Sequence, residues 1–264
     1  MEIEKARTLK VLMIGNSFSE DTVPHMSGMA KSVGFTDFEI ATLMIGGCPL
    51  SLHYSNSKSG AKNYDFYRFD KDRDEWVIVG GKALIDGFNY SKWDYVTIQQ
   101  ASHFSGKPDT YNQDLDGMIS FIKEHNKNAK IVWNMTWAYG GGYPGLELYG
   151  NSQMEMYNSI VSTVQSKIEN REEFFAVSPA GTAIQNARTS FLGDTLNRDG
   201  LHLSYGLGRY ISGLTMFCVL TGYSPSEVLY RPDGIDEKHI AVAKESVENA
   251  LKQKYSITNS KYTK

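Results

Sequence analysis

Three residues of this sequence are of the types that carry out nucleophilic catalysis, and they lie near opposite ends of the chain. Ser17 follows an apolar run that begins at Lys10, whereas Asp199 and His202 stand three positions apart in a glycine-containing segment. A serine hydroxyl becomes a nucleophile when a histidine takes its proton and a carboxylate holds the other ring nitrogen. The residue types therefore suit a Ser-His-Asp arrangement, provided that the fold brings the two segments together.

Each of these residues also has a non-catalytic interpretation. Serine is a common helix-capping residue, and the segment after Ser17 has helical spacing. Asp199 could make a local turn bond, and His202 could pack as a half-buried aromatic residue. Neither motif decides the matter alone. The combination of a serine at a strand end with an Asp-x-x-His segment favours catalysis.

The elements that must position these residues alternate along the chain. Apolar runs predict buried strands at residues 10–14, 38–45, 93–99, 130–137 and 174–177. Helical spacing predicts helices at about 19–33, 115–126, 154–168, 205–221 and 236–253, before a polar tail that we expect to fray. This alternation predicts one domain over residues 1–264, a three-layer α/β/α fold with a doubly wound, mostly parallel sheet of five strands.

Two glycine-containing corners and one irregular stretch interrupt this pattern. The first strand ends at Gly15 and the second at Gly46-Gly47, the edge at which open α/β sheets bind ligands. Residues 51–92 break the alternation and contain two β-like segments, 64–69 and 75–79, around a polar turn. We expect a hairpin-containing insertion there, which either decorates the fold or forms a wall of the binding site.

Composition excludes several classes of function. The chain has 264 residues, 41% of them hydrophobic, and a net charge of −3, so it lacks the basic excess of a nucleic-acid-binding protein. No apolar run is long enough to span a membrane. Residues 1–7 are charged and predict no signal peptide, so a periplasmic or secreted location is expected only if a leader has been trimmed.

Cysteine and histidine usage argues against a metal or a cofactor. Cys48 and Cys218 lie far apart in apolar surroundings, which predicts two buried thiols rather than a disulfide or zinc site. The six histidines show no paired ligand spacing, and the glycine-rich loop 140–145 lacks the spacing of a phosphate-binding loop. We expect no metal and no organic cofactor. Oligomeric state does not follow from the sequence.

At this point the sequence resembles the SGNH (GDSL-like) hydrolases. Gly15-Asn16-Ser17-Phe18-Ser19 stands where that family has its Gly-Asp-Ser block, and Asp199-Gly200-Leu201-His202 matches its Asp-x-x-His block. The resemblance covers nearly the whole chain, in order and in strand context. It implies a flavodoxin-like, three-layer fold and an ester hydrolase in which Ser17 is the nucleophile, His202 the base and Asp199 its orienting partner.

The resemblance also implies an oxyanion hole. Its donors would be the Ser17 N–H, the Gly47 N–H and a side-chain amide from a third block, where this chain has Gln99-Gln100-Ala101-Ser102 in place of the family's Gly-x-Asn-Asp. Sialate and xylan acetylesterases with a Gln-Gly-Glu block look similar, so we assign Gln100, with Gln99 as the alternative. These amides could instead cap the strand end.

The substrate expected from the same resemblance is a small acyl group, acetyl above all, on a carbohydrate. Four residues near the predicted catalytic edge are candidates for contact with a sugar: His103, Trp137, Tyr139 and Tyr205. Two other interpretations remain open. The chain could be a catalytically silent glycan-binding module, or it could be an acyltransferase that uses the same three residues.

Overall fold

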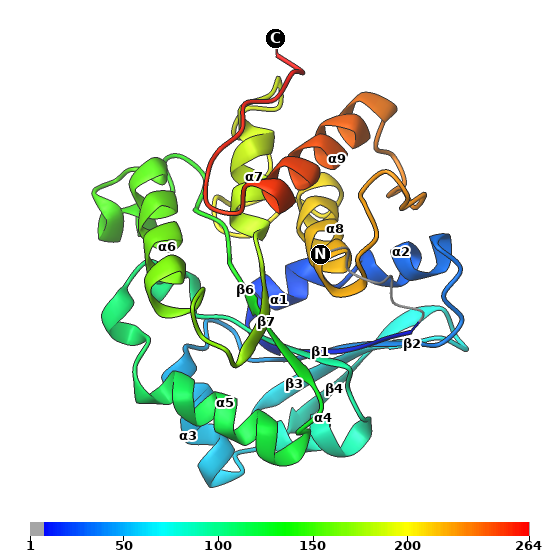
Figure 1. The fold of residues 1–264 in the computed structure, drawn as a ribbon, viewed down its shortest axis with the longest axis vertical. Coiled ribbons are helices and arrows are strands. Elements are labelled where there is room, and N and C mark those ends of the chain that lie inside the picture. The colour runs from blue at the N-terminus through cyan, green and yellow to red at the C-terminus, as the bar shows by residue number, and fades with distance from the viewer. Residues whose placement is uncertain (1–7, 264) are drawn as a thin grey trace.

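The computed structural model describes residues 8–263, which form one seven-stranded sheet between layers of helices (Figure 1). The strand order is β4-β3-β2-β1-β5-β6-β7. The strands are β1 (Leu9–Gly15), β2 (Phe38–Met44), β3 (Tyr64–Asp70), β4 (Glu75–Lys82), β5 (Tyr95–Ile98), β6 (Lys130–Asn134) and β7 (Phe174–Ser178). The N-terminal segment 1–7, for which we expect no signal peptide, lies outside the described residues.

The parallel part of the sheet contains the five strands that the sequence predicts. β1 lies at its centre and pairs in parallel with β2 on one side and β5 on the other. Its side chains are buried except at Lys10, as suits a strand covered on both faces. From β1 the chain winds first to β2 and later back to β5. The carboxyl end of β1 is therefore the switch point at which such sheets form ligand crevices.

The prediction of a three-layer, mostly parallel fold is confirmed, but the sheet has seven strands rather than five. The hairpin expected within residues 51–92 forms β3 and β4, and β3 pairs antiparallel with β2. The insertion thus extends the main sheet instead of standing apart from it. Local alternation predicts a hairpin, but the edge to which a hairpin adds depends on long-range pairing.

Helices cover both faces of the sheet (Figure 1). One face carries α1 (Ser17–Thr22), α2 (Met26–Ser32), α7 (Ala180–Arg188), α8 (Leu207–Thr221) and α9 (Glu237–Lys252). The other carries α3 (Leu50–Ser59), α4 (Leu84–Tyr90) and α5 (Gln113–His125), while α6 (Gln153–Lys167) connects β6 to β7. Within residues 8–263 no helix has the length and apolarity needed to cross a membrane. Both cysteines are buried free thiols, as predicted.

The structure differs from the sequence-based expectations in three segments. The helix expected over 19–33 is two helices, because Pro24 lies between α1 and α2 and interior proline breaks a helix. The sequence analysis did not predict α7, and all nine of its residues are buried, the polar ones included, so its polar residues mark no solvent-facing side. The tail does not fray, since the Phe191 N–H donates to the Tyr262 carbonyl over 2.9 Å and the chain packs along α7.

Candidate active site

Ser17 is the first residue of α1, directly after the turn that ends β1. Asn16 is the capping residue of that helix, because its side-chain oxygen accepts the Phe18 N–H at 3.0 Å. The capping interpretation of Ser17 is therefore wrong, since its neighbour fills that role. The Ser17 hydroxyl is therefore not used as a helix cap, and it lies at the carboxyl end of the central strand.

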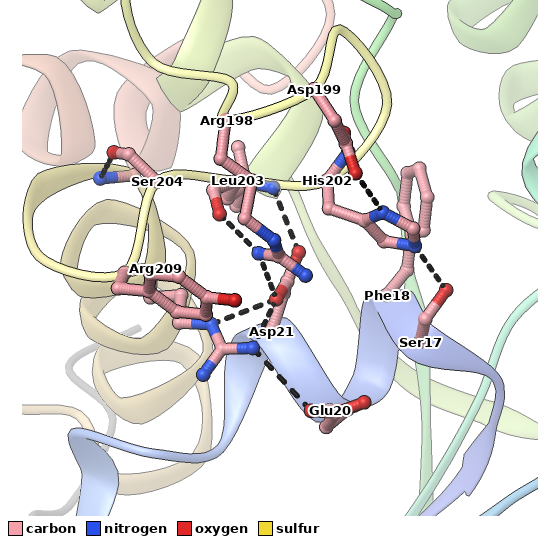
Figure 2. Close-up of polar contacts among 12 residues, drawn as sticks. Ser17, Phe18, Glu20, Asp21, Arg198, Asp199, His202, Leu203, Ser204 and Arg209 are labelled. Carbon is pink, nitrogen blue, oxygen red and sulfur yellow. Dashed lines mark hydrogen bonds and ion pairs between the residues drawn. The ribbon is translucent and has the colours of Figure 1, made fainter.

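The structure brings Ser17, His202 and Asp199 together in a hydrogen-bonded chain (Figure 2). His202 Nε2 lies 2.9 Å from Ser17 Oγ, and His202 Nδ1 lies 2.7 Å from Asp199 Oδ2. The other carboxylate oxygen of Asp199 accepts the backbone N–H groups of Leu201 and His202. Asp199 thus makes the local turn bonds of its non-catalytic interpretation while it also holds the imidazole.

The charge of Asp199 and the tautomer of His202 follow from the environment of the Asp199 carboxyl group. Partial burial raises the pKa of its carboxyl group, but hydrogen bonds from the His202 ring and from two backbone N–H groups outweigh it and lower the pKa to about 2. The carboxyl group is therefore ionised at neutral pH and accepts a hydrogen bond from the Nδ1–H of His202. This assignment leaves Nε2 as the acceptor for the hydroxyl proton of Ser17.

Aromatic packing supports the loop that carries His202. The Trp137 ring stacks on Phe18 with 4.1 Å between ring centroids, and its Nε1 donates to the Leu201 carbonyl at 3.1 Å. Trp137 is fully buried, so the structure corrects its assignment as a sugar-stacking residue. Gly200, in the left-handed region at a φ of 81°, accepts the Gly140 N–H at 2.7 Å.

The other three candidate sugar contacts differ in their exposure. Tyr139 is buried, its hydroxyl donates to Ser102, and burial raises the pKa of that hydroxyl to about 12. It therefore supports the site wall and cannot stack on a ligand. His103 is half-buried against Phe104, with 4.1 Å between the rings. Tyr205 is 66% exposed, and its role in substrate binding stays a prediction.

A buried cluster of amides locks the end of β5 to the Ser17 turn. Gln99 Nε2 donates to Asn16 Oδ1 at 2.9 Å, and Gln99 Oε1 accepts from Ser19 and Asn134. Asn16 Nδ2 donates to the Cys48 carbonyl at 3.2 Å. The backbone partners of Asn16 determine which atom of its side-chain amide is the oxygen and which the nitrogen. This in turn determines the same assignment for Gln99. The Gln99 amide therefore braces the turn.

Both the oxygen and the nitrogen of the Gln100 side-chain amide are hydrogen-bonded within the fold. Its oxygen accepts the backbone N–H groups of Leu50 and Ala101, and its nitrogen donates to the carbonyl and hydroxyl oxygens of Thr110, both at 3.1 Å. No N–H of this amide is left for a substrate oxygen. The structure thus corrects the assignment of Gln100 as an oxyanion donor, in favour of the strand-end interpretation. A buried amide must satisfy its own hydrogen bonds first.

Backbone N–H groups remain as candidate oxyanion donors. Gly47 adopts a φ of 63°, in the turn closed by the bond from the Cys48 N–H to the Ile45 carbonyl. The Asn16 side chain ties this turn to the residue before Ser17. The N–H groups of Ser17 and Gly47 donate to no acceptor within residues 8–263. The assignment of these two donors stays a prediction.

Two surface cavities lie away from Ser17. One of about 560 Å³ lies between α3 and α5, and one of about 470 Å³ lies at the amino end of the sheet, around Trp93. Neither is lined by Ser17, His202 or Asp199. We place the functional site by the hydrogen-bonded geometry instead, because volume alone identifies no chemistry.

Sequence analysis missed one charged residue beside this site. Asp21 lies one helical turn after Ser17, is fully buried, and bonds to Arg198 and Arg209 (Figure 2). The only available signal is its spacing, because residues four apart share a helix face. Spacing does not reveal that an acidic side chain is buried. Its arginine partners come from a loop and a helix at the far end of the sequence.

Comparisons with known proteins place the chain in a family. The sequence profile of DUF4886, a domain of unknown function, matches residues 10–250, so the chain belongs to that family. A crystal structure of a DUF4886 family protein from Bacteroides uniformis is 37% identical and has a TM-score of 0.92, covering 97% of this chain and 100% of that one. No curated protein sequence matches the chain.

More distant structures share the fold alone. A GDSL-like protein from Parabacteroides merdae is 13% identical with a TM-score of 0.54, over 84% of this chain and 98% of that one. A mutant of an acetyl-xylooligosaccharide esterase from Geobacillus is 14% identical with a TM-score of 0.51, over 88% and 100%. The chain therefore has the fold of the SGNH/GDSL hydrolases.

We expect Gln100→Ala to weaken the fold rather than catalysis. The change leaves buried backbone N–H groups of Leu50 and Ala101 without their acceptor, which should lower the free energy of unfolding by about 1–3 kcal/mol. Urea unfolding measures this, with the exposed Gln113→Ala as control. A large loss of ester hydrolysis at unchanged stability would instead restore Gln100 as an oxyanion donor.

We expect Asp199→Asn to change stability in a pH-dependent way. The pKa of Asp199 is about 2 in the folded state against an ordinary value of 3.8, so its contribution is present above pH 4 and is lost as pH falls towards 2. The side chain is 47% exposed, so solvent screening limits the effect to about 1 kcal/mol or less.

Urea unfolding of wild type and Asp199→Asn should therefore differ at pH 6 and converge near pH 2. Asp109→Asn is the control, because Asp109 is exposed and its side chain makes no hydrogen bond within residues 8–263. A difference between wild type and Asp199→Asn that stays constant down to pH 2 would contradict the assigned charge state.

Proposed function

We propose that this DUF4886 protein hydrolyses carboxylic esters, with Ser17 as nucleophile, His202 as general base and Asp199 as the residue that orients the imidazole. One observation carries the proposal. Side chains from opposite ends of the sequence form a single hydrogen-bonded chain at the carboxyl edge of the central strand. Packing alone needs no such chain, whereas acyl transfer needs each of its contacts.

The first half-reaction follows from these contacts. As Ser17 Oγ attacks the ester carbonyl carbon, its proton passes to His202 Nε2, and Asp199 stabilises the resulting imidazolium. The carbonyl oxygen becomes an oxyanion, which the N–H groups of Ser17 and Gly47 would bind. When the C–O bond breaks, His202 returns the proton to the departing alcohol, and the acyl group stays on Ser17.

The second half-reaction repeats these steps with water. His202 takes a proton from a water molecule, whose oxygen attacks the acyl carbon and forms a second oxyanion in the same place. Collapse of this intermediate breaks the bond to Ser17 Oγ and releases a carboxylic acid, and the proton on His202 returns to the serine. An alcohol that outcompeted water at this step would make the protein an acyltransferase.

A small acyl group on a carbohydrate is the substrate that we propose. The catalytic side chains are partly exposed, with about half of the Asp199 side chain open to solvent, and the two cavities described above lie elsewhere. A site that is open to solvent in this way suits an acetyl group better than a long acyl chain. Tyr205 is 66% exposed beside the loop that carries His202, with Arg198 and Arg209 over its ring, and it is the candidate contact for a sugar.

We expect Ser17→Ala and His202→Asn each to reduce p-nitrophenyl acetate hydrolysis by roughly 10⁴-fold or more, because these groups act as a unit. His239→Asn is a matched control. His239 makes the same 2.7 Å contact with an aspartate three positions earlier, but no hydroxyl bonds to its Nε2 within the described chain. Its activity should equal that of wild type.

A fluorophosphonate probe gives a second readout of the same assignment. It should label wild type at Ser17, and it should fail to label Ser17→Ala or His202→Asn. The exposed Ser55→Ala serves as control and should be labelled as wild type is. Hydrolysis by Ser17→Ala at the wild-type rate would refute the proposal. A wild-type protein that binds glycans without being labelled would point to the silent binding module.

We expect kcat/KM to fall as the acyl chain of p-nitrophenyl esters lengthens from acetate to octanoate. Tyr205→Ala should raise KM for acetylated oligosaccharides by about 2- to 10-fold, the range expected for loss of one aromatic contact, and should leave p-nitrophenyl acetate unaffected. Tyr90→Ala is the matched control, because Tyr90 is an exposed tyrosine at the end of α4. A preference for octanoate would contradict the small-acyl assignment.

A further inference from the structure

A buried carboxylate connects the helix of Ser17 to the loop of His202. Asp21 lies on α1, its exposed fraction is 0%, and it is drawn between the two segments in Figure 2. Ionised carboxylates are almost never fully buried unless they are paired and hydrogen-bonded, because their desolvation is costly. The hydrogen-bond and ion-pair partners of Asp21 therefore show which segments this buried carboxylate holds together.

Asp21 contacts both residues that flank the Asp199–His202 segment. Its Oδ2 accepts the backbone N–H of Leu203, the residue after His202, at 2.7 Å. Its Oδ1 accepts from Nη1 of Arg198, the residue before Asp199, at 2.9 Å. The same Arg198 nitrogen also donates to the Leu203 carbonyl. One carboxylate thus fixes the entry and the exit of the short loop that supplies the imidazole.

A third element joins the same carboxylate. Arg209, in the first turn of α8, donates to Asp21 Oδ1 from Nε at 2.8 Å, and its Nη2 forms an ion pair with the same oxygen at 2.7 Å. Next to Asp21, the Thr22 hydroxyl lies 2.8 Å from that of Ser212 on α8. The helix of Ser17 is therefore attached to α8 as well as to the loop. Separating Asp21 from its arginine partners would leave buried charges unpaired. This has a high cost in free energy, so the contact is hard to break.

Helix geometry makes the position of Asp21 significant. Ser17 and Asp21 are four residues apart on one rigid turn of helix, so they share a face and keep a fixed separation. Any shift of the loop relative to α1 must either break the Asp21 contacts or change the 2.9 Å distance between Ser17 Oγ and His202 Nε2. The carboxylate therefore sets the alignment of nucleophile and base.

We propose that Asp21 is a positioning residue, which holds the 198–203 loop on α1 so that His202 faces Ser17. It touches neither the reacting hydroxyl nor the imidazole, and acts through the backbone of Leu203 and the side chain of Arg198. The inference rests on the proposed ester hydrolysis for its kinetic readout. A misalignment of about 1 Å at a reacting centre can cost about 100-fold in rate, which sets the scale of the expected effect.

Asp21→Asn is the direct test, because it keeps the size of the side chain and one acceptor oxygen while removing the charge. We expect kcat for p-nitrophenyl acetate to fall by about 10- to 100-fold with KM within about twofold of wild type. Glu20→Gln is the matched control. Glu20 is the adjacent carboxylate and bonds Arg209 at 3.4 Å, but it makes no contact with the 198–203 loop. Its kcat should equal that of wild type.

A spectroscopic readout separates positioning from the proposed activity. The His202 Nδ1 proton, held by Asp199, should give a downfield proton NMR signal in wild type and in Glu20→Gln, and this signal should broaden or vanish in Asp21→Asn. If wild type hydrolyses no ester but its signal depends on Asp21, the proposed function fails and the positioning role stands. If folded Asp21→Asn keeps wild-type kcat and a wild-type signal, the positioning role is overturned.

Arg198→Met covers the case in which Asp21→Asn does not fold. This change removes one arm of the contact and leaves Asp21 paired with Arg209 and Leu203. It should lower kcat below that of wild type and should broaden the same NMR signal. A folded Arg198→Met protein with wild-type kcat and an unchanged signal would overturn the proposal.

Discussion

The hydrogen bond between Ser17 Oγ and His202 Nε2 requires two segments 185 residues apart to meet within 2.9 Å. Neither segment can hold this distance alone, because each is a short turn at the edge of the sheet. The central position of β1 provides the first part of the solution, since it delivers Ser17 to the switch point of a parallel sheet. The contacts made by the His202 loop provide the rest.

Those contacts are made by the backbone of three residues of the loop. Leu201 is held by the buried Trp137 ring, Gly200 by the Gly140 backbone, and Leu203 by the Asp21 carboxylate. The side chains of Asp199 and His202 point at each other, and His202 also points at Ser17 (Figure 2). The loop is thus anchored mainly through its backbone, which leaves the side chains of Asp199 and His202 free for chemistry.

The glutamines at the end of β5 illustrate how a buried amide is used. Gln99 and Gln100 carry N–H groups that could bind an oxyanion, but Gln100 donates to both oxygens of Thr110 and Gln99 donates to Asn16. An unpaired polar group at this depth would cost free energy in every molecule, bound or not. The backbone N–H groups of Ser17 and Gly47, which have no acceptor within residues 8–263, are the candidate oxyanion donors.

The sequence by itself determined what depends on near neighbours in the chain: the buried strands from their apolar runs, the β3–β4 hairpin from its alternation, and Ser17, Asp199 and His202 as residue types at strand and loop ends. Only the tertiary structure decided that the hairpin extends the sheet, that Trp137 and Tyr139 are buried, and that Gln100 bonds to Thr110. It also revealed Asp21. The physical reason is that residues distant in sequence determine which side chains are buried and which hydrogen-bond partners they have. The identity of a side chain limits the chemistry it can perform, and its surroundings in the fold determine which of those roles it takes.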